Sequence, residues 1–137
     1  MNHLIEVASA IQLAVAPAFL LTGIGAIVGV MTNRLARIID RFRILNQKQM
    51  QNELNKNDFN EIILLKSRAN WTHWAIASTT LSALLVCVVI GLIFIATEVS
   101  FDFDKIIAML FVSATTLLVL GLLLFIKEVA LSKNVLK

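Results

Sequence analysis

Charge is scarce in this sequence, and cysteine and proline are almost missing. Charged residues make up 15% of the 137 positions, well below the roughly 25% that is usual in soluble domains. The one cysteine, Cys87, excludes a disulfide within the chain and any metal site built on several cysteines. Hydrophobic residues instead reach 58%, with a mean hydropathy of +0.84. One domain of this length cannot bury so much apolar surface, so the sequence predicts a membrane protein.

Three long stretches contain no Asp, Glu, Lys or Arg, and each reaches about the 20 residues that a helix needs to cross a bilayer. Backbone groups in lipid must be satisfied within the segment, and three strands could not close a barrel. The predicted fold class is therefore all-α, a three-transmembrane-helix integral membrane protein. It is one domain, 1–137, with spans at about 13–33, 72–97 and 106–126 and a cytoplasmic antiparallel helical hairpin at 34–70.

The distribution of basic residues predicts the orientation. Residues 34–68 hold eight of the 12 lysines and arginines, the tail holds Lys127, Lys133 and Lys137, and the second loop holds only Lys105. By the positive-inside rule the hairpin and the C-terminus are expected to be cytoplasmic and the N-terminus to lie outside. No lysine or arginine precedes Arg34, so a secretory signal peptide is not indicated and the first span is expected to be retained.

The first span is expected to continue into the hairpin as one helix. Beyond Asn33 an apolar stripe keeps helical spacing, and such a stripe needs a partner. Pro17 removes one backbone donor and predicts a bend or the start of the spanning part. Asp58 and Glu61 resemble a capping box that begins the second helix of the hairpin. The stripe comprises Leu35, Ile38, Phe42, Leu45, Met50 and Leu54.

Small residues mark one side of the first span. Gly25 and Gly29 are four apart, and small residues at that interval let helix backbones approach closely in lipid. The partner is either another helix of the same chain or the first helix of another copy. Steps of three, four and seven also place Gln12, Phe19, Thr22, Ala26, Gly29 and Asn33 near one face.

This face predicts either a packing seam or, if several copies surround an axis, the wall of a pore. Arg34, Arg37, Arg41 and Asp40 follow it. They would form a basic cytoplasmic mouth, contact anionic lipid headgroups, or hold the helix in register by their charge.

Other chemistry is not indicated. His3 and His73 have no second ligand at metal-binding spacing, and no serine or cysteine has a histidine placed to activate it. We therefore expect no enzyme activity, no cofactor and no metal. The spans lack a central ionisable residue, which argues against proton-coupled transport. The basic hairpin has no aromatic interleaving or nucleotide motif, so nucleic acid is not an expected partner.

Two short motifs stand out in residues 11–45. Pro17, Phe19 and Leu20 form Pro-x-Phe-Leu, and residues 32–37 read Thr-Asn-Arg-Leu-Ala-Arg, with Asp40 and Arg41 soon after. This run resembles the opening of a bacterial membrane family catalogued as domain of unknown function 2721. Three spans with a charged loop after the first are also typical of that family. The resemblance implies a small bacterial inner-membrane protein and carries no activity with it.

Two functions from different classes follow. One is a homo-oligomeric membrane protein that conducts ions through a pore lined by the first helix, with Phe19 at a dewetting constriction and a cytoplasmic helical stalk. The alternative is a membrane scaffold or assembly factor that binds a partner helix through the apolar stripe of the hairpin. The expected partners are the bilayer with its anionic headgroups, further copies of the chain and ions.

Overall fold

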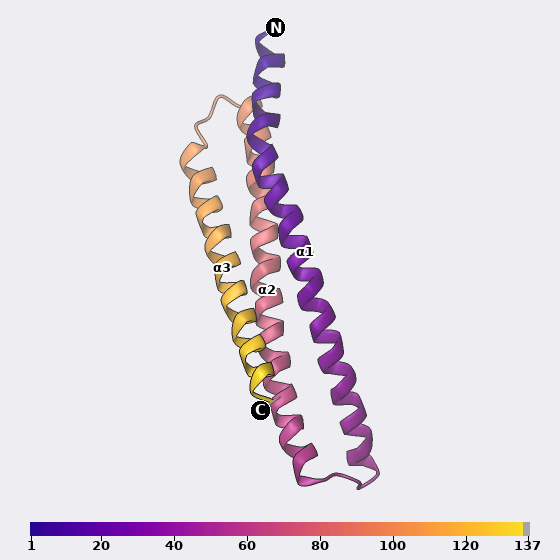
Figure 1. Ribbon diagram of the computed structural model, residues 1–137. Coiled ribbons are helices and arrows are strands. Elements are labelled where there is room, and N and C mark those ends of the chain that lie inside the picture. Colours follow the sequence, from indigo (N-terminus) through magenta and orange to yellow (C-terminus); the bar gives the residue numbers. More distant parts are fainter. Residues whose placement is uncertain (136–137) are drawn as a thin grey trace.

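The protein consists of three long helices connected by short loops (Figure 1). The structure is a computed structural model that describes the backbone of residues 1–135 and the side chains through Lys133. Lys137, counted above with the basic tail, lies outside the described residues. All three helices are long and apolar enough to cross a membrane, and each contains one predicted span. The helices are α1 (Asn2–Met50), α2 (Lys56–Glu98) and α3 (Asp104–Val135).

Helix α1 is unbroken for 49 residues, which corresponds to a length of about 70 Å at 1.5 Å per residue. It runs through Pro17 without interruption, because a proline removes only one backbone hydrogen bond and its neighbours continue the helix. It also passes through residues 32–34, where the apolar span gives way to charge. The predicted continuity between the first span and the hairpin is therefore present in the structure.

A seven-residue interval governs how α1 packs. Its buried residues Pro17, Ile24, Met31, Ile38 and Leu45 recur every seven positions, and Ala10 extends the series at the N-terminal end. A seven-residue repeat keeps one stripe of a helix on its neighbour over many turns when the pair supercoils gently. The stripe faces α2, so α1 and α2 form one long antiparallel pair.

Helix α2 is the central element, since it packs along both α1 and α3 whereas those two have few direct contacts. One apolar cluster lies in the hairpin, where Ile38 and Leu45 of α1 meet Ile62 and Leu65 of α2. A second lies within the spans, where Ile24, Val86 and Ala114 bring one residue from each helix together. Four residues of the predicted stripe, Ile38, Phe42, Leu45 and Leu54, thus pack within the chain, whereas Met50 is 83% exposed.

The hairpin turn begins the second helix earlier than the sequence indicated. The α2 N-cap is Asn55, whose backbone N–H donates to the Asp58 carboxylate at 3.4 Å. Asp58 is therefore the third helical residue of a capping box and not its first member. Glu61, expected to complete the box, is instead free to pair with α1. Asn52 carries the turn with a positive φ of 57°, a conformation that asparagine tolerates well.

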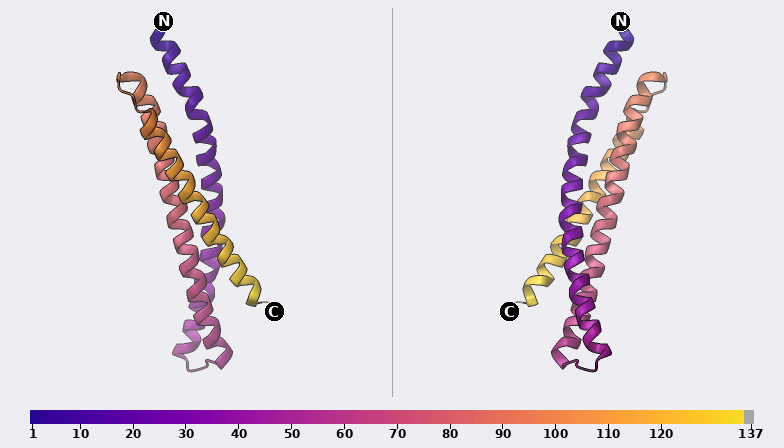
Figure 2. Two further views of the ribbon diagram at one scale, coloured as in Figure 1. Left: turned by 90° about the vertical axis from the view of Figure 1, so that its left-hand side faces the viewer. Right: turned by 90° about the vertical axis from the view of Figure 1, so that its right-hand side faces the viewer.

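Helices α2 and α3 cross obliquely (Figure 2). Small residues lie where the two helices are in close contact. Gly121 is buried, and a Cβ at this position would run into the Thr79 hydroxyl and meet the Ala75 carbonyl oxygen at 3.2 Å and the Thr79 nitrogen at 3.3 Å. The Ser82 hydroxyl donates to the Ala114 carbonyl at 2.6 Å, which adds an interhelical hydrogen bond. Close packing through a glycine therefore occurs here, between the second and third helices.

Candidate functional site: a buried ionic cluster and an open helix face

Glu128 is the most deeply buried charged residue of the described chain, with none of its surface exposed. It lies on α3 and is held by arginines from both other helices. Arg34 of α1 donates from Nε to Oε2 at 3.1 Å and from Nη2 to Oε1 at 3.4 Å. Arg68 of α2 donates from Nε to Oε1 at 3.1 Å. We call these three residues the Glu128 cluster.

The electrostatics of the Glu128 cluster explain why a carboxylate is tolerated there. Burying an ionised carboxylate is costly unless opposite charges and hydrogen bonds compensate it. Two guanidinium groups supply both, and their side chains keep 33% and 18% of their surface exposed, so one side of the cluster is open. Because each charge comes from a different helix, the cluster connects all three elements at one level.

That level also carries two cation–aromatic contacts. The Arg34 guanidinium lies 5.6 Å from the centre of the Phe125 ring, and the Lys127 ammonium lies 4.3 Å from the centre of the Trp71 ring. Both contacts join α3 to another helix. A layer of charged and aromatic side chains is typical of a membrane–water boundary.

Beyond this layer, an exposed ion pair joins the two arms of the hairpin. Arg41 donates from Nε to Glu61 Oε1 at 2.7 Å and from Nη2 to Oε2 at 3.2 Å. The hydrogen bond and the charge of Glu61 raise the pKa of Arg41 above its ordinary value. The fork geometry fixes the register of α1 on α2, although an exposed pair contributes little free energy.

The predicted face of α1 points away from the rest of the chain. Each of its residues lies two positions from a member of the buried stripe, and two residues turn a helix by about 200°. Phe19 is 74% exposed, and all the others are exposed as well. A Cβ added to Gly25 or Gly29 would have nothing within 4 Å. We call this face the outer seam: Gln12, Phe19, Thr22, Ala26, Gly29 and Asn33.

The residues predicted at a basic mouth divide into two sets. Arg34 and Arg41 bind Glu128 and Glu61 within the chain. Arg37 and Asp40 are exposed, on the side of α1 that continues the outer seam. Asp40 takes part in none of the ion pairs of the described residues, all of which run between helices.

Sequence reasoning missed Glu128, Arg68 and Glu61 as partners. Glu128 lies just beyond the predicted third span, 106–126, and was given no role, while Arg34 and Arg41 were expected at a cytoplasmic mouth, at lipid headgroups or as charges that hold the helix in register. A usable signal was present, because Ala114, Gly121 and Glu128 follow one another at seven-residue intervals on α3. That interval places the acid on the same buried face as two small residues.

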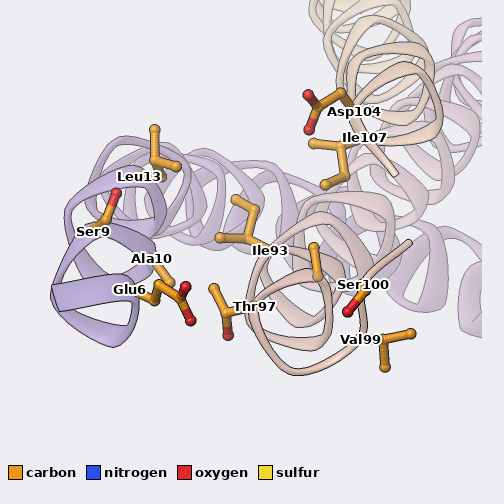
Figure 3. A pocket seen from close by; sticks show the side chains of 11 residues that line it. Glu6, Ser9, Ala10, Leu13, Ile93, Thr97, Val99, Ser100, Asp104 and Ile107 are labelled. Carbon is orange, nitrogen blue, oxygen red and sulfur yellow. The ribbon is translucent and has the colours of Figure 1, made fainter. Parts of the chain in front are cut away.

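The opposite end of the molecule has an open cleft of about 490 Å³ between the three helices (Figure 3). Glu6 of α1 lies beside Thr97 of α2, and Asp104 of α3 lies at the far side. Near it, His3 and Glu98 are 3.5 Å apart and well exposed. Within the described residues no three His, Cys, Asp or Glu side chains gather as metal ligands would.

Three apolar helices of spanning length, joined by charges at one boundary layer, indicate the class of multi-pass helical membrane proteins. The chain belongs to the family described as protein of unknown function DUF2721, whose model matches residues 14–137. The matched range contains the Glu128 cluster and the outer seam from Phe19 onward. Comparison with curated proteins and with solved structures gives no match.

Proposed function

We propose that several copies of this protein assemble around an axis through their outer seams and form an ion-conducting pore lined by α1. The observation that carries the proposal is that the outer seam is uncovered along its whole length. Gln12, Phe19, Ala26 and Asn33 repeat at the same seven-residue interval as the buried stripe. A second seven-residue seam suits a second long helical neighbour, and another α1 presents the matching surface.

The chemistry of the outer seam suits contact between helices in lipid. Glycine, alanine and threonine allow close backbone approach, which drives association where hydrophobicity cannot. The Thr22 hydroxyl donates to the Ala18 carbonyl at 3.2 Å, so the polar groups that the seam presents are mainly the exposed amides of Gln12 and Asn33. Phe19 would be the bulkiest side chain near the axis and would form a constriction that dewets.

The Glu128 cluster would set the rotation of α1 in this assembly. Arg34 reaches sideways to α3, which leaves Arg37 and Asp40 as the charged residues near the mouth. We further propose that this mouth and the hairpin lie in the cytoplasm and that the membrane is the bacterial inner membrane. The excess of basic residues in residues 34–68 supports that orientation.

The test is ion flux through protein reconstituted in vesicles. The intact protein should pass ions, and Phe19→Asn should increase the flux because a polar side chain wets the constriction. Phe94→Asn is the matched control, since Phe94 is an exposed phenylalanine of α2 away from the outer seam. Vesicles that stay impermeable across voltage and salt, or equal effects of both variants, would contradict the pore.

The scaffold alternative is weaker in the form that the sequence indicated. Ile38 and Leu45, at the centre of the stripe that would receive a partner helix, are covered by Ile62 and Leu65 of α2. A partner would have to use other hairpin residues, of which Phe59 and Ile63 are 57% and 56% exposed. Co-purification that depends on these two residues would favour that function.

A further inference from the structure

A groove of about 470 Å³ runs along the contact between α2 and α3. It lies between Trp71–Leu81 on one side and Leu117–Lys127 on the other, and we call it the tryptophan groove. Ala77 and Ser78 are its small residues, and the Ser78 hydroxyl donates to the Leu117 carbonyl at 2.7 Å. Because that hydroxyl is already bonded, the surface of the groove suits hydrocarbon.

The length of the tryptophan groove matches one leaflet of a bilayer. Residues 71–81 and 117–127 each extend about 15 Å along a helix axis. Half of a hydrocarbon core of about 30 Å is the same distance. The groove starts in the layer of charged and aromatic residues at Trp71 and ends near the level of Leu81 and Leu117. An acyl chain that enters from the boundary would therefore lie along it.

Charge at the open end selects the headgroup. The Lys127 ammonium lies over the Trp71 ring at 4.3 Å and borders the groove. In the same layer Arg34 and Arg68 share the single carboxylate of Glu128, which leaves an excess of positive charge. This positive charge would attract the headgroup of an anionic phospholipid, whose phosphate carries no positively charged choline.

We propose that the tryptophan groove is a binding site for one anionic phospholipid, whose acyl chain occupies the groove and whose phosphate contacts Lys127. Lipid binding at this site is a property separate from ion conduction and does not depend on the proposed pore. It would bind lipid in a single copy as well as in an oligomer.

The two tryptophans of the chain both line the groove, so their fluorescence reports on its occupant. The experiment places the full chain in vesicles that contain phosphatidylcholine or phosphatidylglycerol with brominated acyl chains, which quench tryptophan on contact. Phosphatidylglycerol should occupy the groove and quench the tryptophans with an affinity about fivefold higher than that of phosphatidylcholine. This is the preference expected from one lysine near an anionic headgroup. Equal competition by the two lipids would overturn the proposal.

Two pairs of variants separate the site from general attraction to the membrane. Lys127→Gln should abolish the preference, whereas Lys133→Gln, an exposed lysine further along α3, should retain it. Equal losses of the lipid preference in the two variants would show a general electrostatic attraction between the protein and anionic lipid, and would overturn the assignment to Lys127. Ala77→Leu should reduce quenching by both lipids, whereas Cys87→Leu, exposed on α2 outside the groove, should not. Unchanged quenching in Ala77→Leu would overturn the groove as the site.

Discussion

Glu128 and Arg34 are 94 positions apart in the sequence, and their side chains bond at 3.1 Å. The carboxylate is fully buried and also accepts from Arg68. This relationship determines how the third helix is held against the first, since α1 and α3 otherwise touch little. In the proposed pore it would also determine which side of α1 faces the axis.

Removing the charge of Glu128 should destabilise the protein. In Glu128→Gln two partly buried guanidinium groups lose their shared counter-charge, and we expect a loss of about 1–3 kcal/mol in the free energy of unfolding. Denaturation in detergent micelles, followed by circular dichroism, measures it. Glu53→Gln removes an exposed carboxylate and should change stability little. Similar losses in both variants would show that the cluster does not hold the helices together.

The α2–α3 crossing should tolerate no side chain at Gly121. Gly121→Ala would bring a Cβ to 3.2 Å from a backbone oxygen of α2, and a backbone atom yields only if the whole helix shifts. We expect destabilisation of about 1–3 kcal/mol. Gly91→Ala is the control, because nothing lies within 4 Å of its added Cβ and alanine favours helix. If Gly121→Ala unfolds like the control, the crossing is looser than described.

Assembly through the outer seam should be detectable by cysteine crosslinking in membranes. After Cys87→Ser removes the exposed native thiol, Ala26→Cys should yield covalent dimers on oxidation, because the seams of neighbouring copies meet. Val112→Cys provides the comparison, because Val112 is a residue of α3 that is 62% exposed. Non-reducing electrophoresis gives the readout, and equal dimer yields from the two positions would count against the proposed axis.

The ion pair between Arg41 and Glu61 should matter less than the Glu128 cluster. Arg41→Gln should cost at most about 1 kcal/mol, because the pair is exposed to solvent and salt. The raised pKa of Arg41 means that its contribution is complete below the ordinary arginine pKa and is lost only in stronger base. The difference between Arg41→Gln and the native chain should therefore be constant from about pH 6 to about pH 9 with respect to this arginine. Unfolding measured across that range checks it.

Much of the helical architecture could be predicted because hydrophobic runs and caps are local signals. The spans lie inside the helices, and the stripe through Ile38 and Leu45 packs within the hairpin as its period required. The capping box was misplaced by three residues because Asn55–Asp58 and Asp58–Glu61 present the same pattern. Local sequence does not distinguish the two; in the structure Asn55 and Asp58 form the box, and Glu61 pairs with Arg41.

The partners of individual residues were less predictable than the helices. Gly25 and Gly29 carry the more familiar packing motif, yet the glycine in close contact with another helix is Gly121. Small-residue spacing marks a surface that can be approached but not what approaches it. The six residues that the sequence places on one face of α1 are all exposed, and their position opposite α2 required the buried stripe to be known.

By itself the sequence determined the class of this protein, because more apolar surface than one small domain can bury requires a bilayer, and unbroken apolar runs in a bilayer require helices. It also determined that α1 continues beyond its span, since the helical period does not stop at Asn33. Only the tertiary structure decided that Glu128 pairs with Arg34 and Arg68 and that no other helix of the chain covers the outer seam. The physical reason is that periodicity defines faces along one helix, whereas the pairing of faces depends on how distant helices cross.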